Sequence, residues 1–162
     1  MAAAPEHLYR DDFYAWTRHQ AAELRKLAQT GPNVALDFPH LIEEVADLGR
    51  SERNAVHSHV RVIIEHALKL EHSQAGDPRI GWYETIIRAR SDLEDKLTPT
   101  LRRDLQRNLQ RVYRLARRSA FQSLRLHGET EPAEALPPDC PWRLADLLDP
   151  DWFPASRHGL EP

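Results

Sequence analysis

Apolar side chains recur every three or four residues along most of this 162-residue chain. That interval is typical of an α-helix with one buried face, whereas a strand with one buried face alternates apolar and polar residues. No segment of the sequence keeps the alternating pattern. The sequence therefore predicts an all-α fold.

The same pattern, together with signals for helix starts and ends, predicts four long helices. Pro39 and Pro99 each suit the first turn of a helix, and Thr98 precedes Pro99 as an N-cap residue. Gly128 suits the position just after a helix end. We place the four helices at about residues 11–29, 39–73, 80–97 and 99–127.

The helix expected at 39–73 is the longest, and its apolar stripe predicts the side that faces the core. Gly49 interrupts the stripe and is expected to bend the helix, at a cost near ~1 kcal/mol relative to alanine. The residues predicted to face inward are Leu41, Val45, Leu48, Glu52, Ala55 with Val56, His59, Ile63, His66 and Leu70.

Short links between these helices favour an antiparallel four-helix-type bundle with long second and fourth helices. We expect the bundle to occupy residues 8–128 of a single domain that spans residues 1–162. The proline-rich segment 129–154 is too apolar for a free tail, since it contains Trp142, Leu147, Trp152 and Phe153. It is expected to pack on the bundle as an irregular segment with one short helix at 142–148, which leaves 155–162 as a loose tail.

Composition limits the compartment and the kind of partner. The formal net charge is −3, so no overall positive field attracts nucleic acid or membrane. Cys140 is the single cysteine, which excludes an internal disulfide framework and fits a reducing compartment. The first residues lack the pattern of a signal peptide, and no stretch approaches the ~20 apolar residues of a membrane helix. We therefore expect a cytoplasmic protein without a membrane partner.

Histidines in the helix expected at 39–73 are the candidate metal ligands. Glu52, His59 and His66 are seven residues apart, so they share a face but stand about 10.5 Å apart along the axis. They cannot hold one metal from this helix alone, and the HExxH pattern is absent. We interpret His59 and His66 as core-edge imidazoles bonded to neighbouring helices, with a divalent metal as the alternative. His57 and His72 are expected at the surface.

An acidic cluster and the single cysteine give weaker signals. Glu43, Glu44 and Asp47 are spaced to hold a hard cation or to act as an acid–base pair. We interpret them as a solvated face near a helix start, where negative charge is favourable. Cys140 lies between prolines with no histidine nearby in sequence, so we interpret it as a packing residue and assign no catalytic residue.

Arginines dominate the helix expected at 99–127. Residues 99–128 carry eight arginines against Asp104 alone, whereas residues 129–162 carry two arginines against eight acids. We interpret the arginines as a surface strip paired with acids of the second and third helices and of the acidic tail, and a nucleic-acid surface is the alternative. The strip comprises Arg103, Arg107, Arg111, Arg114, Arg118 and Arg125.

Five stretches occur together in a recognisable order: DDFYAWTRHQAAELR, LIEEVADLGRSE, EHALKL, GWYETI and PPDCPWRLADLLDPDWFP. In this order they resemble the bacterial family catalogued as domain of unknown function 29, over about Leu8 to Pro154. The chain departs from the family with Leu70 where tryptophan is usual and with RAR where a glutamine–arginine pair is common. The resemblance implies an all-helical fold without an assigned activity, and motif residues at Phe13, Trp16, Gln20, Glu43, Glu44, Asp47, Leu48, His66, Lys69, Trp82 and Cys140.

These observations favour a non-enzymatic helical interaction or regulatory module. Its expected partner is another protein or a second copy of the chain, and no cofactor is expected. One alternative is a metal- or small-ligand-binding helical bundle with hydrolase activity. The other alternative is nucleic-acid binding through the arginine-rich helix.

Overall fold

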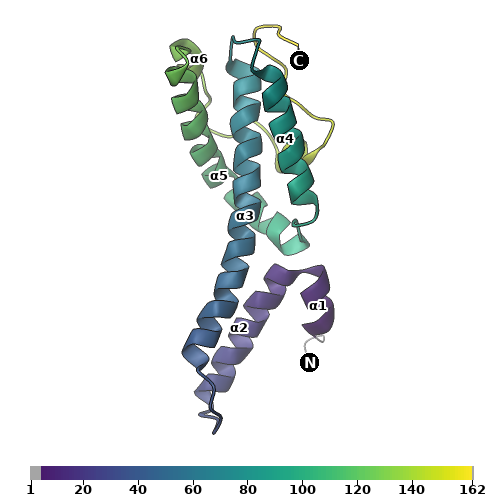
Figure 1. Ribbon diagram of the computed structural model, residues 1–162, viewed down its shortest axis with the longest axis vertical. Helices are drawn as coiled ribbons and strands as arrows, with labels where there is room; N and C mark the ends of the chain where they lie inside the picture. The colour runs from purple at the N-terminus through teal and green to yellow at the C-terminus, as the bar shows by residue number, and fades with distance from the viewer. Residues whose placement is uncertain (1–4, 162) are drawn as a thin grey trace. The chain divides into compact units, whose positions relative to one another are not determined.

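The computed structural model describes residues 5–161, which form helices and no strand, so the all-α prediction is confirmed. The four long helices that were predicted are present within a few residues of their expected bounds. Two further short helices were not predicted, and the short C-terminal helix begins later than expected. The helices are α1 (Pro5–Asp11), α2 (Phe13–Gln29), α3 (Phe38–His72), α4 (Arg79–Glu94), α5 (Pro99–Leu126), α6 (Thr130–Glu134) and α7 (Leu144–Leu148) (Figure 1).

The chain divides into two compact units. The first unit contains the residues up to Val56 together with Lys96–Arg103, and the second contains His57–Asp95 with the residues from Asp104 onward. The expectations of one domain and of one four-helix bundle stay predictions, and residues 1–4 and 162 lie outside the described range. None of the helices in residues 5–161 has the length and apolar character needed to cross a membrane.

In the first unit, Asp12 lies between α1, which was not predicted, and α2, whose start was expected at about residue 11. Its carboxylate accepts hydrogen bonds from the Ala15 N–H and from the Thr100 N–H, each at 3.0 Å. Burial raises the pKa of Asp12, but these hydrogen bonds outweigh it and leave the pKa below its ordinary value. The side chain thus caps the start of α2 and joins it to the start of α5.

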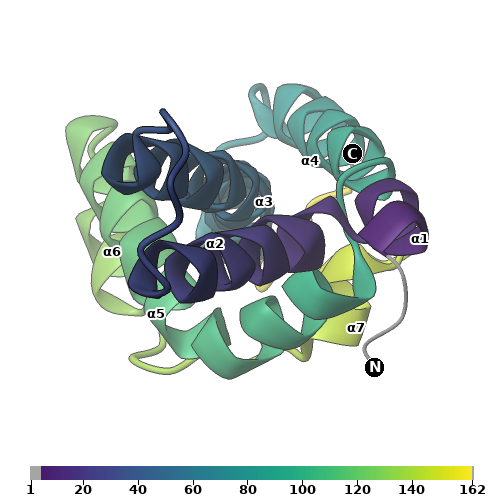
Figure 2. The ribbon, with the colours of Figure 1, turned by 90° about the horizontal axis from the view of Figure 1, so that it is seen from below.

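An aromatic cluster packs α1 against α2, which lie side by side in Figure 2. The Tyr9 ring meets the rings of Phe13 and Trp16 edge-on, at centroid distances of 5.5 and 4.9 Å. The Phe13 and Trp16 rings stack at 5.5 Å. Two of the family-motif residues therefore serve packing between the first two helices.

The approach of α2 to α3 in the first unit depends on Gly49. A Cβ atom on Gly49 would lie 2.3 Å from Thr17 Oγ1 and 3.3 Å from Thr17 Cβ. Thr17 is fully buried, and its hydroxyl donates a hydrogen bond to the Tyr14 carbonyl at 2.8 Å. The glycine that we interpreted as a bend is therefore the point where the two helices meet.

This contact also explains why the predicted inward face of α3 is partly wrong. Leu41 and Leu48 were expected in the core, but they are 39% and 50% exposed. The buried positions seven residues apart begin at Gly49 and continue through Val56, Ile63 and Leu70. The buried face of α3 therefore includes Gly49, where the helix lies closest to α2, and excludes Leu41 and Leu48.

Replacing Gly49 by alanine should lower the free energy of unfolding by about 1–3 kcal/mol, because the added methyl overlaps a buried, hydrogen-bonded side chain. Urea denaturation followed by circular dichroism measures the change. The Thr17→Ala/Gly49→Ala double variant should lose less than the sum of the two single changes, because the overlapping hydroxyl is gone. Purely additive losses would contradict the steric explanation.

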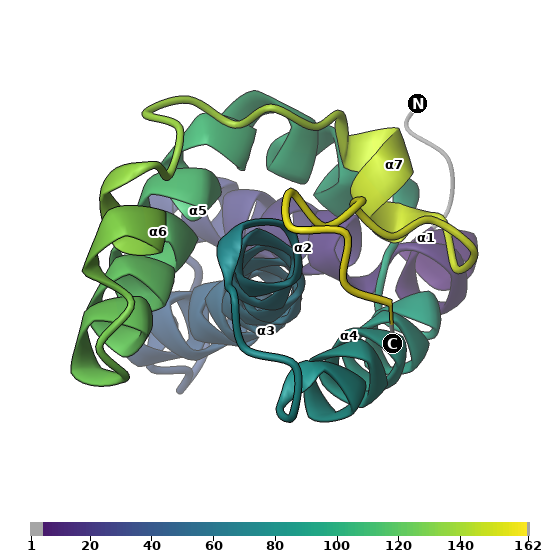
Figure 3. The same ribbon diagram turned by 90° about the horizontal axis from the view of Figure 1, so that it is seen from above.

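In the second unit, the C-terminal half of α3 lies between α4 and α5 (Figures 1 and 3). Figure 3 also shows the chain running from α6 along α5 to α7 and then back across the end of α3. The fully buried apolar side chains that fill this core include Ile63, Ile64, Leu68, Leu70, Leu105, Tyr113, Ala116, Ala120 and Leu147.

Side chains from α4 and α5 hold the irregular segment through its backbone carbonyls. The Tyr113 hydroxyl donates to the Pro137 carbonyl at 2.6 Å, and Arg117 donates to the carbonyls of Leu136 and Pro137. Arg90 donates from α4 to three further carbonyls between residues 147 and 152. Proline-rich backbone cannot satisfy its own carbonyls in a helix, so these donors take that role.

The expected loose tail is not what the structure shows for residues 157–160. The Arg157 N–H donates to the Glu71 carbonyl at 2.9 Å, and His158 Nε2 lies 3.0 Å from the His72 carbonyl. Arg79 donates to the carbonyls of both Leu70 and Leu160. The last carbonyls of a helix lack partners within the helix, and the C-terminal segment supplies donors for them.

Candidate functional site

Five arginines of the predicted strip lie in the second unit on the exposed side of α5. At about 100° per residue, they fall within a narrow arc opposite the buried residues of the helix, such as Leu105, Val112 and Ala116. Arg103 belongs to the first unit, where it donates to the Thr100 hydroxyl at 3.2 Å. The five that define the arginine strip from here on are Arg107, Arg111, Arg114, Arg118 and Arg125.

The strip is at the surface as predicted, but the predicted pairing with acids is wrong. Within the part of the chain that the structure describes, none of its arginines forms an ion pair with a carboxylate. The irregular segment contacts α5 through Gln110, Tyr113 and Arg117, which lie on a neighbouring side of the helix. The segment's acids therefore do not neutralise the strip.

The candidate metal ligands do not assemble a metal site. In residues 5–161, no group of three His, Cys, Asp or Glu side chains is placed to hold a metal ion. His59 and His66 are half-buried, and Glu52 is half-buried in the first unit. His59 Nδ1 lies 3.9 Å from Asp92 Oδ2.

His66 bonds within its own helix and not to a neighbouring helix as expected. Its Nδ1 lies 2.9 Å from the Val62 carbonyl, one turn earlier on α3. Burial lowers the pKa of His66, which keeps the ring neutral at pH 7. A neutral ring that donates to a helix carbonyl is a satisfied structural imidazole.

The expectation that His57 lies at the surface is wrong. Its side chain is 17% exposed, and Nε2 lies 2.6 Å from Asp104 Oδ2. Asn108 Nδ2 donates to Asp104 Oδ1 at 3.2 Å. A histidine–aspartate pair can activate a nucleophile, but no hydroxyl or thiol among the described residues is hydrogen-bonded to this ring.

The remaining family-motif residues are distributed over both units. Glu43 and Glu44 are exposed, Asp47 pairs with Arg50, and Gln20 is half-buried. Burial raises the pKa of the Cys140 thiol, which donates to the Trp142 carbonyl at 3.3 Å. This thiol is a packing group as predicted, because a reactive cysteine needs a lowered pKa.

Two motif residues, Lys69 and Trp82, line a mostly apolar cavity of about 220 Å³ in the second unit. The Lys69 ammonium lies 2.9 Å from Glu65 Oε1. Glu129 on the cavity wall accepts hydrogen bonds from the Ser73 hydroxyl and the Gln74 N–H, at 2.7 and 2.6 Å. The ammonium group of Lys69 and the carboxylate of Glu129 are therefore both bonded to neighbours in the protein.

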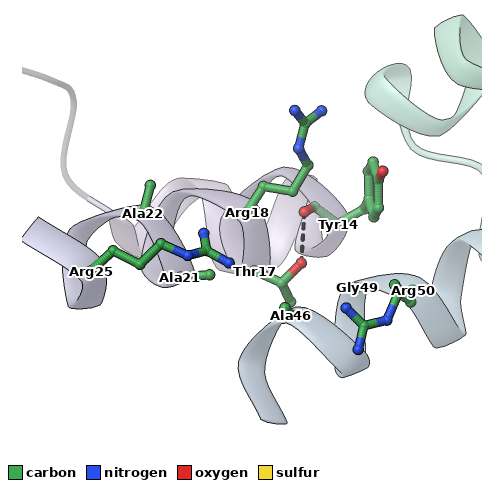
Figure 4. Close-up of a pocket in the computed structure, with 9 residues that line it drawn as sticks. All are labelled: Tyr14, Thr17, Arg18, Ala21, Ala22, Arg25, Ala46, Gly49 and Arg50. Carbon is green, nitrogen blue, oxygen red and sulfur yellow. Dashed lines mark hydrogen bonds between the residues drawn. The ribbon is translucent and has the colours of Figure 1, made fainter. Parts of the chain in front are cut away.

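A second pocket, of about 360 Å³, lies between α2 and α3 in the first unit (Figure 4). Its floor is formed by residues with little or no side chain, among them Ala21, Ala46 and Gly49. Because these side chains are small, α2 and α3 can approach each other at Gly49, and space remains beside that contact.

Three arginines line this pocket: Arg18 and Arg25 from α2, and Arg50 from α3. Figure 4 shows the Arg25 side chain extending along α2 toward Thr17, and the Arg50 side chain extending back toward Ala46. No aspartate or glutamate lines the pocket. This site was not predicted from the sequence, although the spacing of Arg18 and Arg25 by seven residues places both on one side of a helix.

These features define an all-helical protein with two arginine-rich surfaces: a strip in one unit that has no ion pair among residues 5–161, and an arginine-lined pocket in the other unit. The chain belongs to the family described as domain of unknown function DUF29, whose sequence pattern matches residues 8–153. It is also similar to the crystal structure of an α-helical protein of unknown function from Rhodospirillum rubrum. The two chains are 26% identical over 89% of this chain and 90% of that one, with a TM-score of 0.75. Comparison with curated proteins gave no significant match.

Proposed function

We propose that this protein is a non-enzymatic interaction module whose arginine strip binds an acidic segment of a partner protein. The observation that carries the proposal is the strip itself, whose five exposed guanidinium groups have no carboxylate partner in residues 5–161. From Arg107 to Arg125 the strip extends about 27 Å along α5, since a helix rises about 1.5 Å per residue. An acidic segment of similar length would meet several guanidinium groups at once.

A protein partner fits this surface better than a nucleic acid. Leu115 and Leu126 are 49% and 86% exposed on the same helix, and arginine together with apolar contact is typical of protein interfaces. Phe121 lies on the same helix, and Arg125 of the strip lies over its ring at 5.7 Å. It is therefore not a free stacking platform for a base. The formal net charge of −3 also opposes a long phosphate backbone.

A second copy of the chain is one source of such a segment. Glu131 and Glu134 in α6 are exposed, and residues 129–162 carry more acids than arginines. Self-association between the strip of one copy and these acids of another is a form of the same function, and it changes only the identity of the partner.

Replacing Arg111, Arg114 and Arg118 together by glutamate should weaken binding of a short fluorescent polyglutamate peptide by roughly tenfold or more. Three exposed ion pairs of about 0.5 kcal/mol each amount to about one factor of ten. Fluorescence anisotropy measures the affinity, which should fall with added salt. Arg88→Glu on α4 is the control to compare with the single change Arg114→Glu, because each reverses one exposed charge and Arg88 lies away from the strip.

An unchanged peptide affinity in the triple variant would contradict the proposal, as would tighter binding of single- or double-stranded oligonucleotides than of the peptide. Light scattering on the purified chain measures its oligomeric state and so distinguishes a second copy of the chain from a different protein as the partner. A dimer that the triple variant loses indicates a second copy, whereas a monomer that binds the peptide indicates a different protein.

A further inference from the structure

We infer that the arginine-lined pocket of the first unit binds a small molecule that carries a phosphate group. This site lies between α2 and α3 and is separate from the strip on α5. The charge of its walls, its floor of small side chains and its size support this inference.

The walls of the pocket are positive. Among the described residues, Arg18 and Arg25 form no ion pair, and Arg18 lies over the Tyr14 ring at 5.9 Å. Arg50 pairs with Asp47 on the preceding turn of α3, an exposed contact. The pocket therefore presents two uncompensated guanidinium groups and a third whose partner is accessible to solvent.

A phosphate group matches these walls chemically. A phosphate ester carries about −1.5 to −2 charges at pH 7 and offers three strong acceptor oxygens. A guanidinium group donates two parallel hydrogen bonds to such oxygens, so arginines on two helices can bind different oxygens of one group. Figure 4 shows the guanidinium groups of Arg25 on α2 and Arg50 on α3 on either side of Thr17, whereas Arg18 extends from α2 away from α3.

The floor and the volume indicate a small molecule. Thr17 donates its hydroxyl to the Tyr14 carbonyl, and Ala21 and Ala46 carry only methyl groups, so the floor offers contact surface without competing charge. The volume of about 360 Å³ lies at the lower end of the range of about 300–1,000 Å³ for small-molecule sites. A sugar phosphate is of suitable size.

The test is a calorimetric titration of the full chain with inorganic phosphate and with glucose 6-phosphate at constant ionic strength. We expect Arg18→Gln and Arg25→Gln each to weaken binding roughly tenfold, through loss of charge-assisted hydrogen bonds. Lys26→Gln removes the same charge from α2 but lies outside the pocket, so it should leave binding unchanged. Asp47→Asn should strengthen binding roughly two- to fivefold, because it removes a nearby negative charge.

Three results would overturn the inference. The first is the absence of saturable binding of either soluble phosphate compound. The second is an equal loss of affinity in Lys26→Gln and Arg25→Gln, which would show a diffuse electrostatic effect. The third is binding to phosphatidic acid vesicles, but not to glucose 6-phosphate, which would assign the arginines to a membrane surface. All four side chains are exposed, so we expect each variant to keep the fold, and thermal unfolding of each variant checks this.

Discussion

Replacing Arg90 by alanine should lower the free energy of unfolding by about 3–5 kcal/mol. The side chain is 9% exposed and donates to the carbonyls of Leu147, Pro150 and Trp152, at 3.0, 3.3 and 2.8 Å. Its guanidinium group also lies 4.9 Å from the centre of the Phe153 ring. Alanine would leave three carbonyls without their donor and would open a cavity beneath the ring.

Urea denaturation measures this loss, and the total tryptophan fluorescence includes a contribution from the segment itself, where the rings of Trp142 and Trp152 pack 5.5 Å apart. Arg90→Lys should be nearly as destabilising as alanine, since an ammonium group cannot reproduce the planar fork of donors. Arg88→Ala, two residues earlier and exposed, should cost little. A loss below about 1 kcal/mol in Arg90→Ala would contradict the role of this residue as an anchor.

Acidification from pH 6.5 to pH 4 should remove about 3 kcal/mol of folding stability through His72 alone. The side chain is 1% exposed, and burial, together with the nearby charges of Arg157 and His158, lowers its pKa from 6.5 to about 4. In this window the unfolded chain protonates the ring while the folded protein keeps it neutral. The unfolded state therefore binds more protons, and the stability falls as the pH falls.

The His72→Gln variant isolates this contribution, because glutamine has no proton to gain in this range. The difference in unfolding free energy between the variant and the parent should change by about 3 kcal/mol between pH 6.5 and pH 4. Comparison with the parent is needed because burial also lowers the pKa of His66, which adds to the slope in both proteins. Parallel pH profiles would show that His72 is not neutral in the folded state.

The long helices could be predicted because each carries its own signals. Thr98 caps the start of α5 by accepting from the Leu101 N–H, and Gly128 follows its end at a φ of 80°. The role of Asp12 as the cap of α2 was missed because acids at a helix start look the same whether they lie in the first turn or cap it. The hydrogen bond from the Thr100 N–H, 88 residues away, fixes Asp12 in the capping position.

The candidate sites were predictable only where one helix carries the whole pattern. The arginine strip repeats on α5 and was placed correctly at the surface. The pocket combines side chains of α2 and α3, and its defining feature is missing side-chain volume at Gly49 and the alanines, which no charge pattern reveals. His57 and His72 were misplaced for the same reason, since the groups that cover them come from 47 and 86 residues further along the chain.

The end of α3 obtains its hydrogen-bond donors only after the C-terminal segment has been synthesised. Donors to the carbonyls of Glu71 and His72 reside at Arg157 and His158, so a ribosome completes α3 long before those donors emerge from its tunnel. During that interval the final turn of this helix depends on water for its hydrogen bonds. The longest helix of the protein is therefore finished late in folding, although it is synthesised early.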